Sequence, residues 1–194
     1  MRIAIIPARG GSVRIPRKNI KMFHGHPMIW YPIQAALRSS LFDDILVSTD
    51  DDEIGQLADD YGAIPIPRNK DWLVKDDGTR GTQEVASDLL VAHPKLVPDQ
   101  VCVIYPCSPL LLPEYLIDSQ EYLYNSDYVM SVQAEPLADA GCFYWGQYKA
   151  FIYRQPLIGT STVIYPLPPE RCCDINTPED WARAEKMYEK MRND

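Results

Sequence analysis

Several kinds of segment are missing from this sequence of 194 residues. No apolar run reaches the roughly 18 residues that a membrane-spanning helix needs, so we expect no association with a membrane. The N-terminal stretch MRIAII is too short for the apolar region of a secretory signal and leads at once into Pro7 and Arg9. No CxxC spacing occurs, and five cysteines, of which Cys172 and Cys173 are adjacent, make a poor disulfide framework. We therefore expect a cytoplasmic protein with buried, reduced thiols.

Acidic residues are absent from positions 1–42, which carry seven Arg or Lys, whereas positions 43–194 carry twelve basic and 27 acidic residues. The net charge of −8 argues against an extended basic face, so we expect no nucleic-acid partner. The local excess of positive charge near the N-terminus nevertheless predicts an anionic ligand there.

Short apolar runs alternate along the chain with amphipathic helical patterns. Strands are predicted at 2–6, 44–48, 63–66, 101–105, 128–132, 142–145 and 162–165, and helices at 27–39, 50–61, 82–92, 113–124 and 178–191. This order predicts an α/β fold in one domain, 1–194, with a mostly parallel sheet between two layers of helices. Ligands bind at the carboxyl ends of the strands in such sheets.

A basic, glycine-containing loop at 7–21 follows the first predicted strand and carries five cations beside Gly10 and Gly11. Glycines let backbone N–H groups approach an anion, and Arg and Lys neutralise phosphate charge. The loop has neither the GxxxxGK[ST] nor the GxGxxG pattern. We interpret it as a polyphosphate site, and the alternative is a solvated basic loop.

Other patterns have structural interpretations. His24 and His26 lack acidic or cysteine neighbours at a metal-ligand spacing, which favours a plain loop over a metal site. Asp50 and Glu53 have the spacing of a capping box at a helix start. Pro27 suits the first turn of a helix.

Three segments near the N-terminus, IIPARGGSVRIPRKNI (5–20), GHPMI (25–29) and VSTDDDEI (47–54), carry a family resemblance. They resemble the cytidylyltransferases that activate nine-carbon acidic sugars, the CMP-sialic acid synthetase group. The segments DAGCFYWG (139–146) and DINTPEDWARAEKMYE (174–189) extend the resemblance over nearly the whole chain. It implies a nucleotide-diphosphosugar-transferase-like α/β fold. The implied substrates are CTP and pseudaminic acid, which yield a CMP-sugar and pyrophosphate with Mg²⁺; N-acetylneuraminic and legionaminic acids are the alternatives.

Carried over by motif position, the resemblance also implies roles for individual residues. Arg9 and Lys18 would be catalytic, and the nucleotide would contact Ala8, Arg9, Gly10, Gly11, Ser12, Lys18, Asn19 (at the ribose), Arg68 and Thr82. The sugar would contact Tyr105, Ser108, Phe143 and Tyr144, and Mg²⁺ would bind Asp174 and Asn176. For Thr82 the alternative is a helix cap. For Phe143 and Tyr144 it is the core, and for Asp174 and Asn176 it is a turn before a helix that Thr177 caps.

The chain departs from the family pattern at three places. Val13 stands where the family has a lysine beside the triphosphate, and Asn176 stands where it has a second aspartate. Each departure removes a useful charge, which favours as an alternative a nucleotide-binding homologue with weak or no catalysis. At 136–137 the family carries a longer arm for sugar binding and dimer contact. Either the chain lacks this arm or the sequence as given omits it, and a homodimer is possible.

Overall fold

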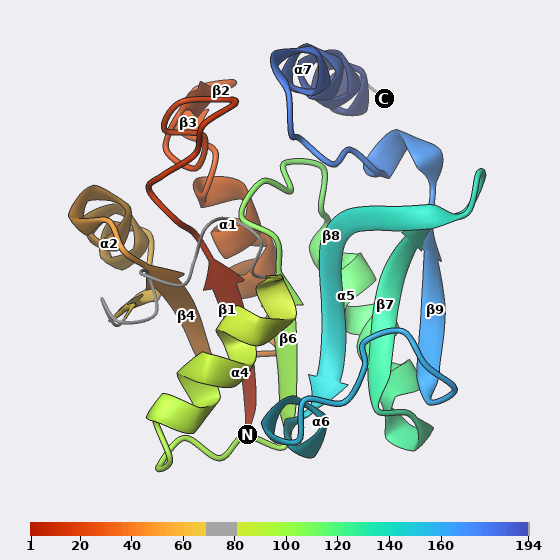
Figure 1. The fold of residues 1–194 in the computed structure, drawn as a ribbon. Coiled ribbons are helices and arrows are strands. Elements are labelled where there is room, and N and C mark those ends of the chain that lie inside the picture. Colours follow the sequence, from red (N-terminus) through yellow and green to blue (C-terminus); the bar gives the residue numbers. More distant parts are fainter. Residues whose placement is uncertain (69–80, 194) are drawn as a thin grey trace.

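The fold is built on one central sheet, which a computed structural model of residues 1–68 and 81–193 displays (Figure 1). Within those residues its seven strands have the order β5-β4-β1-β6-β8-β7-β9. All neighbouring strands are parallel except at β8, which is antiparallel to β6 and β7. The strands are β1 (Arg2–Pro7), β4 (Asp44–Thr49), β5 (Ile64–Pro67), β6 (Gln100–Ile104), β7 (Tyr128–Gln133), β8 (Ala138–Gln147) and β9 (Thr162–Leu167).

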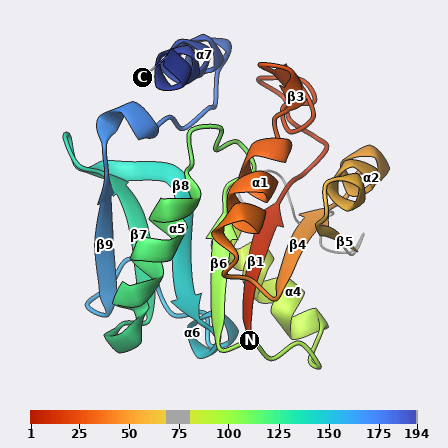
Figure 2. The same cartoon turned by 180° about the vertical axis from the view of Figure 1, so that it is seen from behind.

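Helices cover both faces of the sheet (Figures 1 and 2). The helices α1 (Trp30–Ser39), α2 (Asp52–Asp60) and α5 (Pro113–Gln120) pack on one face, and α4 (Thr82–Ala92) and α6 (Tyr148–Ile152) pack on the other. Alternate residues of β1 supply the two cores: Ala4 and Ile6 belong to the first, Ile3 and Ile5 to the second. A strand buried on both faces needs such an uninterrupted apolar run. The predicted three-layer α/β fold is confirmed.

A third hydrophobic cluster lies beyond the carboxyl ends of the central strands. It joins the hairpin of β2 (Met22–Phe23) and β3 (His26–Pro27) to the helix α7 (Pro178–Asn193). Phe23 is fully buried there, with its ring centroid 5.4 Å from that of Trp181. His26 stacks on Trp30 at 3.8 Å. The cluster therefore holds the hairpin and the C-terminal helix together beyond the carboxyl ends of the strands, whereas Met1 lies at the opposite end of the sheet (Figure 1).

Two predictions of helix starts are wrong. Pro27 lies in β3 rather than in a first helical turn, because Met28 N–H bonds to Lys21 O at 3.0 Å and closes the hairpin before α1 begins at Trp30. Asp51, not Asp50, caps α2: its carboxylate accepts the Ile54 N–H at 3.0 Å.

Other connections differ in detail from the prediction. The predicted helix at 113–124 divides into α5 and the 3₁₀ helix η1 (Glu121–Asn125), and a second 3₁₀ helix, η2 (Pro169–Arg171), precedes α7. The helix α6 was not predicted. The junction at 136–137 is part of a tight turn, 134–137, between β7 and β8. Residues 69–80, between the predicted strand at 63–66 and the predicted helix at 82–92, lie outside the described residues.

All five cysteines are buried and unpaired, as predicted. Among the described residues, no helix is both long and apolar enough to cross a bilayer.

Candidate functional site

A cavity of about 320 Å³ opens at the carboxyl ends of β1 and β6. Residues far apart in the sequence meet there because the parallel strands end at one edge of the sheet. The predicted site residues that line it are Arg9, Ser12, Lys18, Asn19, Arg68, Thr82, Tyr105, Asp174 and Asn176. Those that do not line it are Ala8, Gly10, Gly11, Ser108, Phe143 and Tyr144.

The five cations of loop 7–21 have different partners. Arg9, Arg14 and Lys18 line the cavity. Arg17 instead pairs with Asp51 and Glu53 of the α2 start, and the Lys21 ammonium lies 4.3 Å from the ring centroid of Trp181. Three of the five cations are therefore placed to meet an anion in the cavity.

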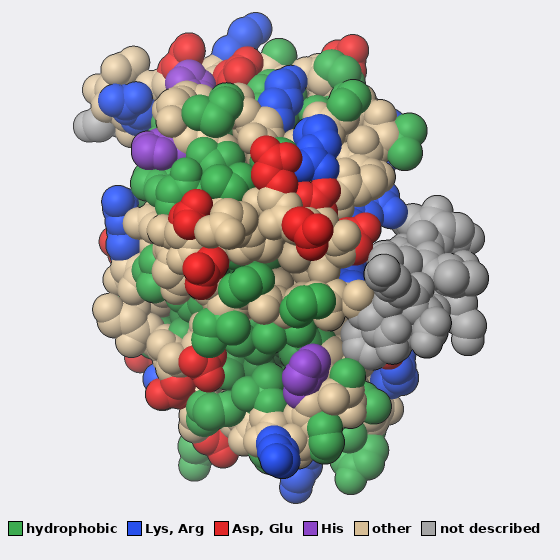
Figure 3. All heavy atoms as spheres, turned by 90° about the vertical axis from the view of Figure 1, so that its left-hand side faces the viewer, with side chains coloured by type: hydrophobic (Ala, Val, Ile, Leu, Met, Phe, Trp, Pro, Cys, Tyr) green, Lys and Arg blue, Asp and Glu red, His purple; other side chains and the backbone are tan. Residues whose placement is uncertain are grey.

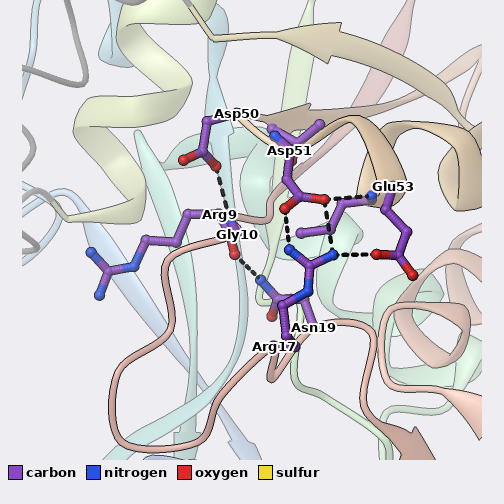
Figure 4. A network of polar contacts seen from close by, with 9 residues as sticks. Arg9, Gly10, Arg17, Asn19, Asp50, Asp51 and Glu53 are labelled. Atoms are coloured by element: carbon purple, nitrogen blue, oxygen red, sulfur yellow. Dashed lines mark hydrogen bonds and ion pairs between the residues drawn. The ribbon is translucent and has the colours of Figure 1, made fainter.

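Asn19 holds the backbone of this loop. Its side chain is buried, its amide donates to Arg9 O at 2.8 Å, and its Oδ1 accepts the Cys107 thiol at 3.3 Å. The Arg9 side chain points away from this contact (Figure 4), and within the described residues no carboxylate pairs with it. Lys18 Nζ donates to Ile175 O at 2.5 Å, so the loop is also tied to the segment before α7.

Arg68 and Thr82 come from a different part of the chain, after β5 and at the start of α4. Arg68 Nε donates to Ser48 Oγ at 3.3 Å, which anchors the guanidinium at the end of β4. Thr82 is the first helical residue and its Oγ1 accepts the Tyr144 hydroxyl at 3.1 Å, whereas Gly81 is the cap residue. The helix-cap alternative for Thr82 is therefore wrong.

Asp174 and Asn176 form the predicted metal side of the cavity. Asn176 Nδ2 donates to Asp174 Oδ2 at 2.5 Å, and Asn176 Oδ1 accepts from Arg14 at 3.3 Å. A carboxylate and an amide oxygen are ligand types that Mg²⁺ accepts, together with phosphate and water oxygens. The amide presents its nitrogen to the carboxylate here, so joint binding of a cation requires rotation of the amide. Among the described residues no three His, Cys, Asp or Glu side chains form a metal cluster.

Gly141 makes room for Asp174. Its φ is +61°, and a Cβ there would lie 2.9 Å from the Asp174 Cβ. Only a residue without a side chain combines this backbone conformation with so close an approach.

The same segment also caps α7. Thr177 Oγ1 accepts the Asp180 N–H at 3.2 Å, and Asp180 Oδ2 accepts the N–H groups of Thr177 at 2.9 Å and of Asn176 at 3.0 Å. The predicted Thr177 cap is confirmed, and it fixes the backbone next to Asp174 rather than excluding a binding role.

The predicted sugar contacts are mostly buried. Ser108 donates to Tyr105 O at 3.0 Å, Phe143 belongs to the sheet core, and Tyr144 is 1% exposed. Of the four, Tyr105 lines the cavity, with its hydroxyl 3.4 Å from Asp139 Oδ2. Burial, with the nearby Asp139 charge, raises the pKa of Tyr105 to about 12. Phe143 and Tyr144 match the core alternative, so we do not retain them as sugar contacts.

A second cavity, of about 330 Å³, adjoins the first across Asp174. Gln133, Asp139 and Arg183 contribute polar side chains to it. Neither Asp139 nor Arg183 is among the residues predicted for the site. Asp139 could have been found from the sequence, because it is the first residue of the DAGCFYWG segment that carries the family resemblance. Arg183 could not, because it is one of several charged residues on an amphipathic helix and no motif distinguishes it.

Comparisons with known proteins find a matching sequence family and a similar fold. A family model described as Cytidylyltransferase matches residues 3–144. The chain is 33% identical over 224 aligned residues to a pseudaminic acid cytidylyltransferase of Campylobacter jejuni, covering 96% of this chain and 95% of the relative. It is 30% identical to a CMP-N,N'-diacetyllegionaminic acid synthase of Legionella pneumophila, covering 96% of each.

A solved structure of CMP:2-keto-3-deoxy-manno-octonic acid synthetase in complex with CTP has the same fold. The TM-score is 0.76 at 13% identity, and the match covers 98% of this chain and 99% of that chain.

Proposed function

Because the chain belongs to the cytidylyltransferase family, we propose that it transfers CMP from CTP to an acidic nine-carbon sugar and releases pyrophosphate. The sugar that we propose is pseudaminic acid, because the Campylobacter relative is named as a pseudaminic acid cytidylyltransferase. The observation that carries the proposal is the convergence of Arg9, Arg14 and Lys18 on one cavity that Asp174 also lines. A polyanion with a bound cation would fit this charge arrangement.

In the proposed reaction the anomeric hydroxyl oxygen of the sugar attacks the α-phosphorus of CTP. The bond from that phosphorus to the bridging oxygen breaks, pyrophosphate leaves, and the hydroxyl proton passes to solvent or a base. Negative charge spreads over the phosphoryl and leaving oxygens, so positioned cations stabilise the transition state. Arg9 and Lys18 are the proposed catalytic residues, and Asn19 orients Arg9 through its carbonyl oxygen.

The proposed nucleotide contacts are the cavity-lining Ser12, Arg68 and Thr82, together with backbone N–H groups of loop 7–21. Tyr105 lines the first cavity, and its hydroxyl contacts Asp139, which lines the second. We therefore propose that the sugar binds next to Tyr105, where the two cavities meet. Enzymes of this kind use a divalent metal, which we propose is Mg²⁺ held by Asp174 and Asn176. When bound, it would neutralise phosphate charge.

The test is pyrophosphate release from CTP and Mg²⁺ with pseudaminic, N,N'-diacetyllegionaminic or N-acetylneuraminic acid in parallel. We expect release that requires a sugar and is fastest with pseudaminic acid. Fastest release with another sugar would transfer the assignment to that substrate. CTP binding without release from any sugar would favour the nucleotide-binding homologue, an alternative that Val13 and Asn176 motivate.

The arm at 136–137 belongs to the same proposal. The alignment with the Campylobacter relative extends over 224 residues, more than the 194 of this chain. We propose that the tight turn 134–137 replaces the arm, which leaves the second cavity open at its rim. Sedimentation equilibrium measures the molar mass and therefore shows whether two copies associate. We expect a weaker dimer than a relative with the arm forms.

A further inference from the structure

Three acidic residues at the start of α2 face the basic loop 7–21 (Figure 4). Asp50 Oδ1 accepts the Gly10 N–H at 2.9 Å. The Arg17 guanidinium forms hydrogen bonds with both oxygens of Asp51 and donates to Glu53 at 2.5 Å. The two attachments bracket loop residues 11–16. Acidic and basic side chains lie next to each other on the side of the molecule that bears α2 (Figure 3).

The backbone is shaped for these contacts. A Cβ at Gly10 would lie 2.5 Å from Asp51 Oδ2, so the loop approaches α2 as closely as a glycine permits. Arg17 has a φ of +55°, a left-handed conformation that is unfavourable for a residue with a side chain and that surrounding contacts must maintain. The hydrogen bond from Arg17 is the largest cause that lowers the pKa of Asp51.

The turn at Arg17 also separates two neighbouring cations. The Arg17 side chain reaches α2, whereas Lys18 lines the cavity and donates to Ile175 O. At the other attachment, Gly10 is held next to Arg9, whose side chain lines the cavity. Each contact with α2 is therefore adjacent in sequence to a proposed catalytic cation.

We propose that Asp50, Asp51 and Arg17 are positioning residues, and we call them the loop latch. The loop latch holds loop 7–21 in the form that directs Arg9 and Lys18 at a triphosphate, and Arg17 itself does not bind the nucleotide. This inference rests on the proposed function. It assigns a binding consequence to an exposed ion pair, a kind of contact that by itself contributes little to stability.

The test compares Asp51→Asn and Arg17→Gln with the wild type. In the first variant the asparagine still accepts the Ile54 N–H as the cap of α2, and in the second the glutamine meets the same left-handed backbone cost as arginine. Asp99→Asn is the matched control, because it breaks another exposed ion pair, with the N-terminal ammonium at 2.5 Å, at the opposite end of β1. The readouts are the Kd for CTP with Mg²⁺ by calorimetry, the Tm, and deuterium exchange in residues 8–21 without nucleotide.

We expect each latch variant to weaken CTP binding by about tenfold and to speed exchange in residues 8–21, with a Tm close to wild type. Arg17→Lys should restore part of the affinity, since it keeps the charge without the planar fork. The double variant should bind no worse than Arg17→Gln alone, because that substitution already removes the contacts of Arg17 with both Asp51 and Glu53. Asp99→Asn should leave binding and exchange unchanged.

Unchanged CTP affinity and unchanged exchange in both latch variants would overturn the proposal, as would a tenfold loss in Asp99→Asn. A wild type that does not bind CTP would instead contradict the proposed function. The exchange comparison would then still decide whether the latch fixes the loop.

Discussion

Val13 and Arg14 are neighbours in the loop but have different surroundings. Val13 is 88% exposed at the edge of the cavity, whereas Arg14 donates to Asn176. Arg14 is thus directed at the Asp174 side and does not take the place that a lysine at 13 would have. The contact therefore joins the residue next to Val13 to Asn176, the other position at which the chain lacks a charge of the family pattern.

Val13→Lys should lower the Kd for CTP by roughly tenfold, or about 1.4 kcal/mol, because the ammonium would add a phosphate contact. Calorimetry with CTP and Mg²⁺ measures the change. Val13→Gln, a long but uncharged substitution, should bind like the wild type. Equal gains from both variants would show that contact area, not charge, limits affinity.

Asn176→Asp should lower the Mg²⁺ concentration that gives half-maximal pyrophosphate release by roughly tenfold, since a second carboxylate adds charge to the metal side. Titration with Mg²⁺ at saturating CTP and sugar measures it. Asn125→Asp makes the same chemical change in η1, away from the cavity, and should have no effect. An unchanged Mg²⁺ requirement in Asn176→Asp would remove this residue from the metal site.

Sequence reasoning could identify the basic loop but not separate its cations. Arg17 and Lys18 are adjacent and chemically alike, and their division between α2 and the cavity depends on the φ of Arg17, which is set by tertiary contacts. Aromatic residues posed a similar problem. Phe143 and Tyr105 both belong to buried strand patterns, and only burial in the assembled fold distinguishes the core residue from the cavity residue.

At the scale of elements, apolar runs predicted each strand of the central sheet, and amphipathic patterns predicted α1, α2, α4, α5 and α7, whereas the cap and proline signals misplaced the starts of α1 and α2. The direction of β8 could not be predicted from its sequence pattern. An uninterrupted apolar run is typical of any strand that is buried on both faces, whether it is parallel or antiparallel to its neighbours. The helix α6 is a single short turn after β8, too brief for an amphipathic period. The start of α1 was misplaced because two-residue strands leave no hydrophobic signature.

The cap of α7 should contribute measurably to stability. Thr177→Ala removes the hydroxyl that accepts the Asp180 N–H, and should lower the free energy of unfolding by about 1 kcal/mol. Urea denaturation measures it. Thr177→Ser keeps the hydroxyl and should stay near the wild-type value, so a full loss in Thr177→Ser would point to packing instead.

The same cap predicts a pH dependence. Burial tends to raise the pKa of Asp180, but hydrogen bonds from Asn176 and Thr177 outweigh it and lower the pKa below its ordinary value of 3.8. A lowered folded-state pKa contributes stability above the unfolded value, and this is lost as pH falls through the folded value. The stability difference between wild type and Asp180→Asn should therefore shrink as pH drops from about 6 to about 3. A constant difference would contradict this sign.

At the scale of the whole molecule, the core on the α1 face of the sheet and the cluster beyond the strand ends enclose all five cysteines. Burial raises the pKa of the Cys107 thiol to about 12 and the pKa of Cys102 well above its ordinary value. Thiolates, not thiols, are the reactive form. We expect native protein at pH 8 to react slowly with iodoacetamide and the urea-unfolded protein to react fast at all five positions. Mass spectrometry that found one cysteine fully labelled in the native state would locate a local opening.

The contact between Lys18 and Ile175 joins two parts of the site that are synthesised at different times. The loop proposed to bind phosphate is made near the start of translation, and the proposed metal ligands follow only after every strand of the sheet has been synthesised. A nascent chain on the ribosome therefore carries the proposed anion-binding loop before the segment around Ile175 exists. We therefore expect full affinity for CTP only after α7 has been synthesised and has packed against the hairpin.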